Sequence, residues 1–232
     1  MRRVVGLGAG GHAGVIIEAL RLAGGWHVAA LLDSDPGLHG KEVFGVPVRG
    51  DVSMLPEIVE EGITAAFIGV GGTADNAPRR RLFDEAIAHG LELVPVLHPS
   101  AYIAPSARVG RGCSILARAV INTAASIGDN VIVNTGAIVE HDCTIDDDVH
   151  IATGAQLASG VHVGSGAHVG VGASVRQSLV IGDNAIVGVG AAVIEDVPNG
   201  ATVGGVPARE LKHSSEHDPL KGSRALPQSP CE

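Results

Sequence analysis

A histidine lies between two carboxylic acids in the triplet Glu140-His141-Asp142. An imidazole with the ordinary pKa near 6.5 can take the proton that an attacking amine or hydroxyl must lose. A carboxylate beside the ring can orient it and raise its basicity. Transfer of an acyl group from a thioester needs such a base, together with stabilisation of the oxyanion. His141 is therefore a candidate general base, with a plain surface histidine beside two acids as the alternative.

Glycines mark a second candidate site, in the pattern Gly6-x-Gly8-x-x-Gly11 near the start of the chain. The pattern follows a short apolar run, residues 3–7, and precedes apolar residues at helical spacing from Ala13 to Leu20. Such a turn brings backbone N–H groups and a helix N-terminus to a pair of phosphates. Gly10, Gly11 and His12 are predicted to bind there. A glycine turn needed only for helix–sheet packing is the alternative.

Three further residues stand at the ends of apolar strands expected next to this turn. Asp33 and Ser34 close the strand 27–32, where a carboxylate can meet a ribose hydroxyl or a base edge, although turn and cap chemistry also explains them. Gly71 ends the strand 64–70 and is expected to approach the diphosphate. Because fewer than 100 residues leave no room for two mononucleotide halves, the pattern favours a nucleotide-sugar over a nicotinamide cofactor.

The elements that position these residues alternate between strand and helix over residues 1–98. A last strand is expected at 91–97, and helices are expected after residue 12, from 53 to 61 and from 78 to 90. Alternating strands and helices predict a small Rossmann-like α/β domain with a parallel sheet. The junction His98-Pro99-Ser100 ends it.

An aliphatic residue then recurs every six positions from Ile103 to Val193, without a slip. The residue two positions earlier is most often Ala or Cys, and Gly often follows the aliphatic one. Flat strands joined by corners, three to a coil, make a triangular parallel β-helix of about five coils. Residues 99–212 are predicted to form this all-β domain. Residues 213–232, rich in Ser, Pro and mixed charge, are predicted to be a disordered tail.

Composition excludes several classes of protein. The 232 residues carry a net charge of −9 with no basic run, which argues against nucleic acid and anionic membranes as partners. No apolar run is long enough for a membrane span. Three cysteines, Cys113, Cys143 and Cys231, make no disulfide framework and fit a reducing cytoplasm. We expect a cytoplasmic protein. We also expect no metal site, because the spacing of His141, His150, His162 and His168 does not match the three-histidine site of β-helix carbonic anhydrases.

The chain resembles the bacterial hexapeptide-repeat acetyltransferases that act on nucleotide sugars and sialic acid. Within this family it is most similar to the perosamine N-acetyltransferases. The segments that carry the resemblance are Gly-Ala-Gly-Gly-His (8–12), Leu-Leu-Asp (31–33), His-Pro-Ser-Ala (98–101), Asn-Thr-Gly-Ala-Ile-Val-Glu-His-Asp-Cys (134–143) and Gly-Val-Pro-Ala-Arg (205–209). The resemblance implies a left-handed coil and a homotrimer with active sites between subunits. It also implies acetyl-CoA as cosubstrate and a nucleotide-sugar as substrate.

The same resemblance assigns roles to individual residues. It makes His141 the general base and Asp142 its acidic neighbour, one methylene shorter than the more usual Glu. Asn134 is expected to bond the sugar or His141, unless it is simply a corner asparagine. The residues expected near acetyl-CoA are His150, Gly170, Gly188 and Arg209.

The sequence thus predicts acetyl transfer to the 4-amino group of a nucleotide-linked deoxy sugar, such as GDP-perosamine, in polysaccharide synthesis. Three alternatives stay open. They are an O-acetyltransferase acting on a sugar hydroxyl, a hexapeptide scaffold without catalysis, and a nicotinamide-dependent oxidoreductase.

Overall fold

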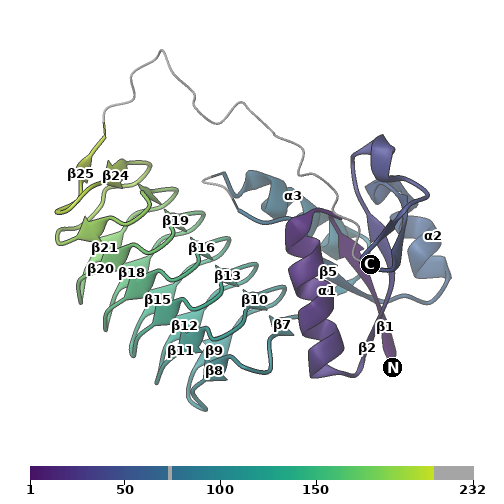
Figure 1. Ribbon diagram of the computed structural model, residues 1–232, viewed down its shortest axis with the longest axis horizontal. Helices are drawn as coiled ribbons and strands as arrows, with labels where there is room; N and C mark the ends of the chain where they lie inside the picture. Colours follow the sequence, from purple (N-terminus) through teal and green to yellow (C-terminus); the bar gives the residue numbers. More distant parts are fainter. Residues whose placement is uncertain (73–74, 212–232) are drawn as a thin grey trace, which may run out of the picture.

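The computed structural model describes residues 1–72 and 75–211, and it has two parts (Figure 1). The first part is a six-stranded sheet in the order β3-β4-β2-β1-β5-β6, with all pairs parallel except β3 with β4. Its elements are β1 (Arg2–Leu7), α1 (Gly11–Ala23), β2 (Trp26–Leu32), η1 (Pro36–Leu38), β3 (Glu42–Val43), β4 (Val46–Gly50), η2 (Val52–Met54), α2 (Leu55–Glu60), β5 (Ala65–Ile68), α3 (Ala77–Ala88) and β6 (Glu92–Leu93).

Helices cover both faces of this sheet. On one face α1 packs Ile16, Ile17 and Leu20 against the strands. On the other face α2 and α3 contribute the second apolar cluster, which includes Ile58 and Phe83. Because successive strand residues point to opposite faces, Val4 of β1 joins the first cluster and its neighbour Val5 joins the second. The α/β prediction for this part is confirmed.

The second part is a left-handed parallel β-helix with the shape of a triangular prism (Figure 1). Its strands are β7 (Val96–Leu97), β8 (Tyr102–Ile103), β9 (Arg108–Val109), β10 (Ser114–Ile115), β11 (Val120–Ile121), β12 (Ser126–Ile127), β13 (Ile132–Val133), β14 (Ile138–Val139), β15 (Thr144–Ile145), β16 (His150–Ile151), β17 (Gln156–Leu157), β18 (His162–Val163), β19 (His168–Val169), β20 (Ser174–Val175), β21 (Val180–Ile181), β22 (Ile186–Val187), β23 (Ala192–Val193), β24 (Thr202–Gly204) and β25 (Arg209–Glu210).

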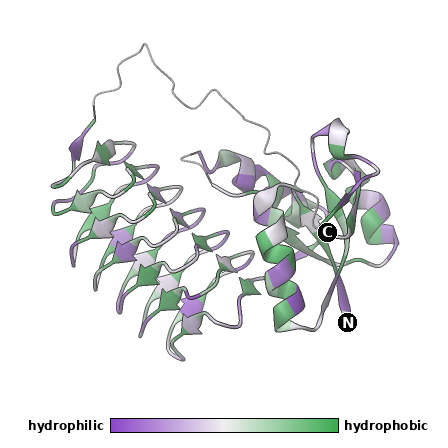
Figure 2. Cartoon of the chain, in the orientation of Figure 1, coloured by the Kyte–Doolittle hydropathy of each residue, from purple (hydrophilic) through white to green (hydrophobic). Residues whose placement is uncertain are grey.

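The strands form three sheets, one for each face of the prism. The first sheet runs β7-β10-β13-β16-β19-β22-β24-β25, the second β8-β11-β14-β17-β20-β23 and the third β9-β12-β15-β18-β21. From β7 to β20, each strand pairs with the strand three hexads further along the chain, as Ile132 does with His150. The predicted six-residue period and three-strand coil are therefore confirmed. In Figure 2 hydrophobic residues recur on the strands of successive coils.

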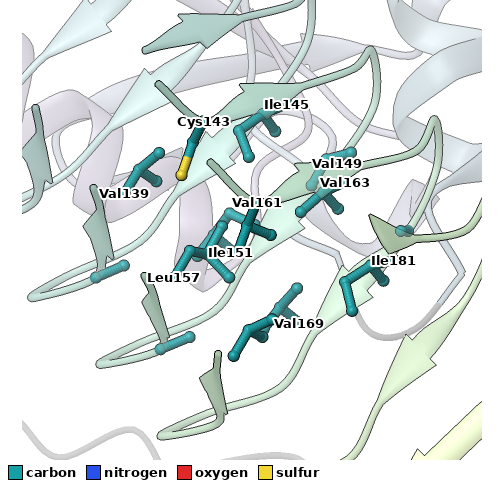
Figure 3. Close-up of a cluster of buried hydrophobic side chains, with 14 of the residues drawn as sticks. Val139, Cys143, Ile145, Val149, Ile151, Leu157, Val161, Val163, Val169 and Ile181 are labelled. Carbon is teal, nitrogen blue, oxygen red and sulfur yellow. The ribbon is translucent and has the colours of Figure 1, made fainter. Parts of the chain in front are cut away.

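The interior of the prism is a column of stacked aliphatic side chains. Of the sixteen predicted inward positions, all from Ile115 to Val193 are buried, and Ile103 and Val109 of the first coil are half-buried. Val139, Leu157 and Val175, which lie in successive coils, follow one another along one side. Figure 3 shows Val139 and Leu157, with Cys143 among the neighbouring side chains, directed to the axis. Small Ala or Cys residues fill the narrower point before most strands, and Val or Leu fills it before the others.

Two separate constraints explain the high glycine content of the coils. One corner residue in every six adopts a positive φ, such as Gly136 at 68° and Asp142 at 61°. The glycines that directly follow the inward aliphatic residue have another reason. A Cβ at Gly170 would lie 2.6 Å from the carbonyl oxygen of Val187 in the next coil. Those glycines are required by the close stacking of coils and not by a turn conformation.

The expected single strand at 91–97 is wrong. β6 pairs with β5 of the α/β sheet, whereas β7 pairs with β10 and begins the prism. Pro95 lies between them and has no N–H to donate to a ladder, so the strand breaks there. The chain therefore passes directly from one part to the other. None of the helices in residues 1–72 and 75–211 is long and apolar enough to span a bilayer. The predicted tail, 213–232, lies outside the described residues.

Removing an inward side chain should cost much more stability than removing an outward one on the next strand. Ile151 is fully buried, so Ile151→Ala is expected to lower the free energy of unfolding by about 2–5 kcal/mol. Gln156→Ala, at an exposed position of β17, should change it by less than about 0.5 kcal/mol. Urea unfolding followed by circular dichroism measures both. Equal losses would contradict the inward register.

Candidate active site

His141 lies at the corner between β14 and β15, and its side chain is 53% exposed. Its Nδ1 is 2.7 Å from Oδ2 of Asp142. Since a carboxylate only accepts, Nδ1 carries the proton in this bond, and Nε2 of the neutral ring is left as an acceptor. The arrangement presents the lone pair of Nε2 to whatever approaches this corner. This is the geometry that a general base needs.

The corner conformation explains how the short Asp142 side chain reaches the ring. Asp142 occupies the corner position that needs a positive φ, which Asp tolerates better than most residues. Glu140 makes different bonds, because its Oε2 accepts from Asn122 Nδ2 at 3.0 Å and from the backbone N–H of His141 at 3.1 Å. Of the two acids, Asp142 holds the imidazole and Glu140 holds the corner backbone.

The glycine turn after β1 combines a packed part and an open part. A Cβ at Gly8 would lie 2.7 Å from Cγ2 of Val70, and its φ is +107°, so glycine is required there. Gly10, the N-cap of α1, and Gly11 face open space instead. Neither residue needs to be glycine for packing or for its φ. Bare backbone at the start of α1 is therefore accessible to a ligand.

Asp33 supports this turn directly. Its Oδ2 accepts from the backbone N–H of Ala9 at 2.6 Å and its Oδ1 accepts from Asp35 N–H at 2.9 Å. A cleft of about 110 Å³ lies beside it, and Gly8, Asp33, Ser34 and Val70 are among its lining residues. The structure thus brings the predicted turn, Asp33 and Ser34 together at the carboxyl ends of β1 and β2.

His12 and Gly71 meet behind the start of α1. A Cβ at Gly71 would lie 3.5 Å from Cβ of His12. The Nε2 atom of His12 is buried and has no hydrogen-bond partner among the described residues. Burial, with the charge of Arg79, lowers the pKa of His12 to about 4, so its ring is neutral at pH 7.

His150 projects outward from β16 and is covered by the α/β part. Its Nδ1 donates to the carbonyl oxygen of Gly72 at 2.9 Å, and its Nε2 accepts from Asn134 Nδ2 at 3.1 Å. The ring of His168 lies 4.9 Å away in an edge-on arrangement, as its place one coil further on predicts. Burial lowers the pKa of His150 to about 3, with a smaller effect of His168. His150 is therefore a neutral residue, buried between the prism and the α/β part, with both ring nitrogens hydrogen-bonded.

The glycines predicted for the cosubstrate lie along a different edge of the prism from His141. Gly170 and Gly188 stand where the first sheet turns into the second, and Arg209 is exposed on β25. The crowding described above already requires glycine at 170. Asn134, predicted to bond the sugar or His141, stands on the same edge as the glycines; its Nδ2 bonds His150 and its Oδ1 accepts from the N–H of Thr135 at 2.8 Å, so within one chain it does not bond His141. Contact of Gly170, Gly188, Arg209 or His150 with acetyl-CoA, and of Asn134 with the sugar, stays a prediction.

One chain does not bring its two candidate sites together. The α/β part packs on the first sheet and on the edge between the third and first sheets, through contacts such as Asn76 with Gly166 and Arg79 with Asn130. His141 stands on the edge between the second and third sheets. In a triangular prism that edge lies opposite the first sheet. The predicted base is therefore on the far side of the prism from its own glycine turn.

The residues that join the two parts were not predicted from the sequence. Arg79 is 1% exposed, and its Nη2 donates to Oδ1 of Asn130 at 2.8 Å. Arg80 bonds Asp148 at 2.8 Å. One signal was present, since Arg79 shares a helical spacing with Phe83 and Ala86, which are both buried. That spacing put an arginine on the inward face of α3.

A cavity of about 480 Å³ lies at this junction and contains none of the predicted site residues. Its lining includes Asn76, Arg80, Asp148 and Asp183. Within 1–72 and 75–211, no group of three or more His, Cys, Asp or Glu side chains is arranged to hold a metal ion.

Comparison with known proteins matches both parts of the chain. Residues 3–86 match the family described as PglD N-terminal domain, and residues 124–159 match the bacterial transferase hexapeptide family, described as six repeats. A curated relative, the redox-sensing transcriptional repressor Rex of Streptomyces coelicolor, is 33% identical over 81 residues, which are 35% of this chain and 30% of the repressor. The chain spans less than a third of that protein, so the match indicates a shared segment and no shared activity.

Solved structures match nearly the whole chain. Perosamine N-acetyltransferase from Caulobacter crescentus, in complex with CoA and GDP-perosamine, is 42% identical with a TM-score of 0.86 over 90% of this chain and 97% of that one. The acetyltransferase domain of PglB from Neisseria gonorrhoeae, in complex with acetyl coenzyme A, is 35% identical with a TM-score of 0.83 over 90% and 99%. WeeI from Acinetobacter baumannii is 27% identical with a TM-score of 0.78 over 91% and 100%.

The fold and the histidine corner thus define a hexapeptide-repeat acetyltransferase with an added α/β part. The chain belongs to the family of nucleotide-sugar acetyltransferases that includes the perosamine N-acetyltransferase of Caulobacter crescentus.

The buried histidines should make stability depend on pH. His12 and His150 have pKa values of about 4 and about 3 when folded, against 6.5 for the free side chain. The unfolded chain therefore binds protons at a higher pH than the folded protein does. The contribution of the two neutral histidines to the free energy of unfolding is complete above pH 6.5, and it is lost as the pH falls toward the pKa values of the folded state. The expected loss is about 1.4 kcal/mol per pH unit for each group.

His150→Asn tests this dependence, since its amide keeps a donor for the Gly72 carbonyl but does not titrate. The free energy of unfolding is measured in urea from pH 7 to pH 4.5. It should fall less steeply with decreasing pH in this variant, because unfolding takes up about one proton fewer. His27→Asn, at an exposed position, is the control and should keep the slope of the unchanged protein. Identical slopes in all three proteins would contradict the prediction.

Proposed function

We propose that this protein transfers the acetyl group of acetyl-CoA to the 4-amino group of a nucleotide-linked amino deoxy sugar, GDP-perosamine or a close analogue. The observation that carries the proposal is the His141–Asp142 pair, which leaves Nε2 free on an exposed corner. The relatives support it, because the Caulobacter crescentus enzyme was crystallised with CoA and GDP-perosamine, also as variants in which a histidine is replaced by Asn or Ala.

His141 would act on the amine as the new bond forms. The sugar nitrogen attacks the thioester carbonyl carbon, and Nε2 of His141 takes the proton that the nitrogen loses. The carbon–sulfur bond then breaks, CoA leaves as the thiolate, and the imidazolium returns the proton to the sulfur. Asp142 keeps the ring in place and stabilises the imidazolium while it exists.

The nucleotide end of the substrate would bind at the glycine turn. Gly10 and Gly11 offer bare backbone at the start of α1 for the diphosphate, with His12 and Gly71 beside them. The cleft next to Asp33 and Ser34 would take the nucleoside. Acetyl-CoA would lie along the other edge, near Gly170 and Gly188, with Arg209 toward its phosphates, and Asn134 on the same edge would bond the sugar. His150 would act there through Asn134, to which it is bonded.

The separation of the two candidate sites favours a homotrimer. Because His141 lies on the far edge from its own glycine turn, a neighbouring subunit would supply the other half of each site. The two described cysteines are free and buried, which fits the cytoplasm as the location. The product would enter polysaccharide biosynthesis.

The experiment that tests the proposed function is thiol release from acetyl-CoA with GDP-, UDP- and dTDP-linked 4-amino sugars and their 4-hydroxy counterparts. Turnover with an amino sugar only is expected, and the best substrate identifies the nucleotide. Turnover with a hydroxy sugar would replace the proposal by O-acetylation. If no acceptor is turned over and calorimetry detects no CoA binding, the result would favour the alternative of a non-catalytic scaffold.

Replacing the base should lower kcat more than it raises KM. His141→Asn removes the proton acceptor and keeps the size of the side chain, so kcat on the amino sugar is expected to fall by about 10²–10⁴-fold. Asp142→Asn keeps His141, so its kcat should fall by a smaller factor. His162→Asn, another exposed histidine on the prism, is the control and should retain kcat. An unchanged kcat in His141→Asn would refute the assignment.

Two inactive variants should restore each other if sites lie between subunits. Gly11→Glu places a carboxylate in open space where the phosphates would bind, without crowding the fold. In trimers formed from equal amounts of His141→Asn and Gly11→Glu chains, about a quarter of the sites receive both unchanged halves. Co-expression should therefore give about a quarter of the activity of the unchanged enzyme. No activity above the two separate variants would place each site within one chain.

A further inference from the structure

Arg79 is the largest side chain buried completely within the described part of the protein, with 1% exposure. It projects from the first turn of α3 into the joint between the α/β sheet and the prism. Its Nη1 donates to the carbonyl oxygen of Val70, and its Nη2 donates to Asn130, to the backbone oxygen at 3.2 Å and to Oδ1 at 2.8 Å. All of these acceptors are neutral.

The nearest carboxylate is already used by other groups. Oδ1 of Asp148 accepts from Asn130 Nδ2 at 2.7 Å, and its Oδ2 accepts from Arg80 Nη1 at 2.8 Å. No described carboxylate lies within hydrogen-bond distance of Arg79. Burial lowers the pKa of Arg79 to about 10, yet the group stays charged at neutral pH. A buried cation without its own counter-ion is costly unless something else compensates it.

The guanidinium lies directly behind the two glycine turns of the candidate nucleotide site. Val70, whose carbonyl it holds, packs on the first turn, since a Cβ at Gly8 would lie 3.0 Å from the Val70 nitrogen. The charge also reaches the start of α1, because Arg79 contributes to the lowered pKa of His12. Its field therefore extends over the backbone of both turns.

The bond to Val70 also sets the direction of the next amide. A trans peptide unit is planar, with its C=O and N–H pointing in opposite directions. Because the Val70 carbonyl points to Arg79, the N–H of Gly71 points away from the joint. No described residue accepts a hydrogen bond from this N–H. A similar tie holds the carbonyl of Gly72 to His150 on the prism.

We propose that Arg79 is the buried counter-charge of the substrate diphosphate and the positioning residue of the Gly71 amide. The inference rests on the proposed function, because it takes the ligand to be a nucleoside diphosphate. Arg79 does not touch the ligand. It places a positive charge with no directly bonded carboxylate behind the glycine turns, where low dielectric makes the charge effective, and it directs an amide donor to the phosphates.

Two substitutions of similar length separate charge from packing. Arg79→Lys keeps the charge and a donor for Val70, and Arg79→Met keeps only the volume. Calorimetry with GDP, guanosine and inorganic pyrophosphate should show GDP and pyrophosphate affinity reduced about 10- to 100-fold in Arg79→Met and less than about fivefold in Arg79→Lys. Guanosine affinity should change by less than about twofold in both. The KM for the nucleotide-sugar should rise while kcat and the KM for acetyl-CoA stay nearly unchanged.

A charge relocation keeps Arg79 itself and so avoids loss of fold. The double variant Asn130→Asp/Asp148→Asn moves the carboxylate from the partner of Arg80 to the partner of Arg79. The side chains at 130 and 148 can still bond each other, with the amide of 148 now donating to the carboxylate of 130. The net charge of the protein is unchanged. GDP affinity should fall about tenfold or more, with guanosine affinity retained. Asp148→Asn alone is the matched control, and it should bind GDP at least as tightly as the unchanged protein.

The outcomes distinguish this inference from the proposed function. If all variants that fold bind GDP and guanosine with parallel losses, or if the relocation leaves GDP binding unchanged, Arg79 is a structural tie and the inference is wrong. If the unchanged protein prefers UDP or dTDP, the choice of nucleotide is wrong and the charge dependence is measured with that nucleotide. If it binds neither any nucleoside diphosphate nor pyrophosphate, both proposals fail.

Discussion

The stacking of coils, each built from three hexads, is the constraint on which the rest of this protein depends. Each inward aliphatic side chain packs on its equivalents in the coils before and after it, so a residue's place in the hexad fixes whether it faces the axis or a corner. The corner needs one residue of positive φ, and at some corners, such as Gly170, the close approach of the next coil also requires glycine. Asp142 is one consequence, because a residue that closes a corner also comes to lie against the ring of His141.

The joint between the two parts has a different physical character from either core. The prism and the sheet are held by apolar packing, whereas the joint combines Phe83 with a polar set of Arg79, Asn130, Asp148 and His150. Polar bonds are directional, so they specify one orientation of α3 on the prism where apolar contact alone would permit sliding. Val70 and Gly72, which follow β5 beside the candidate nucleotide site, are thereby tied to a rigid support.

The structure separates the proposed nucleotide site from the proposed base. The glycine turns, with Asp33 and Arg79 behind them, stand on one side of the prism, and the His141 corner stands on another. In the proposed assembly, the nucleotide end of a substrate would be held by one set of elements while its reacting group extends to a second. The residues proposed for these two roles belong to different elements of structure.

The sequence by itself determined the two parts, the register of the hexads and the pairing of His141 with an acid, because each depends on neighbours along the chain or on a fixed period. It also marked the glycine turn, although not that Asp33 would bind the turn's own backbone. Only the tertiary structure decided that Pro95 divides two strands, that His150 is buried beneath Gly72, and that Arg79 meets Asn130. These contacts join residues 51 and 78 positions apart through the docking of one folded surface on another. No period in the sequence encodes that docking, because it depends on the shapes of both surfaces once they have formed.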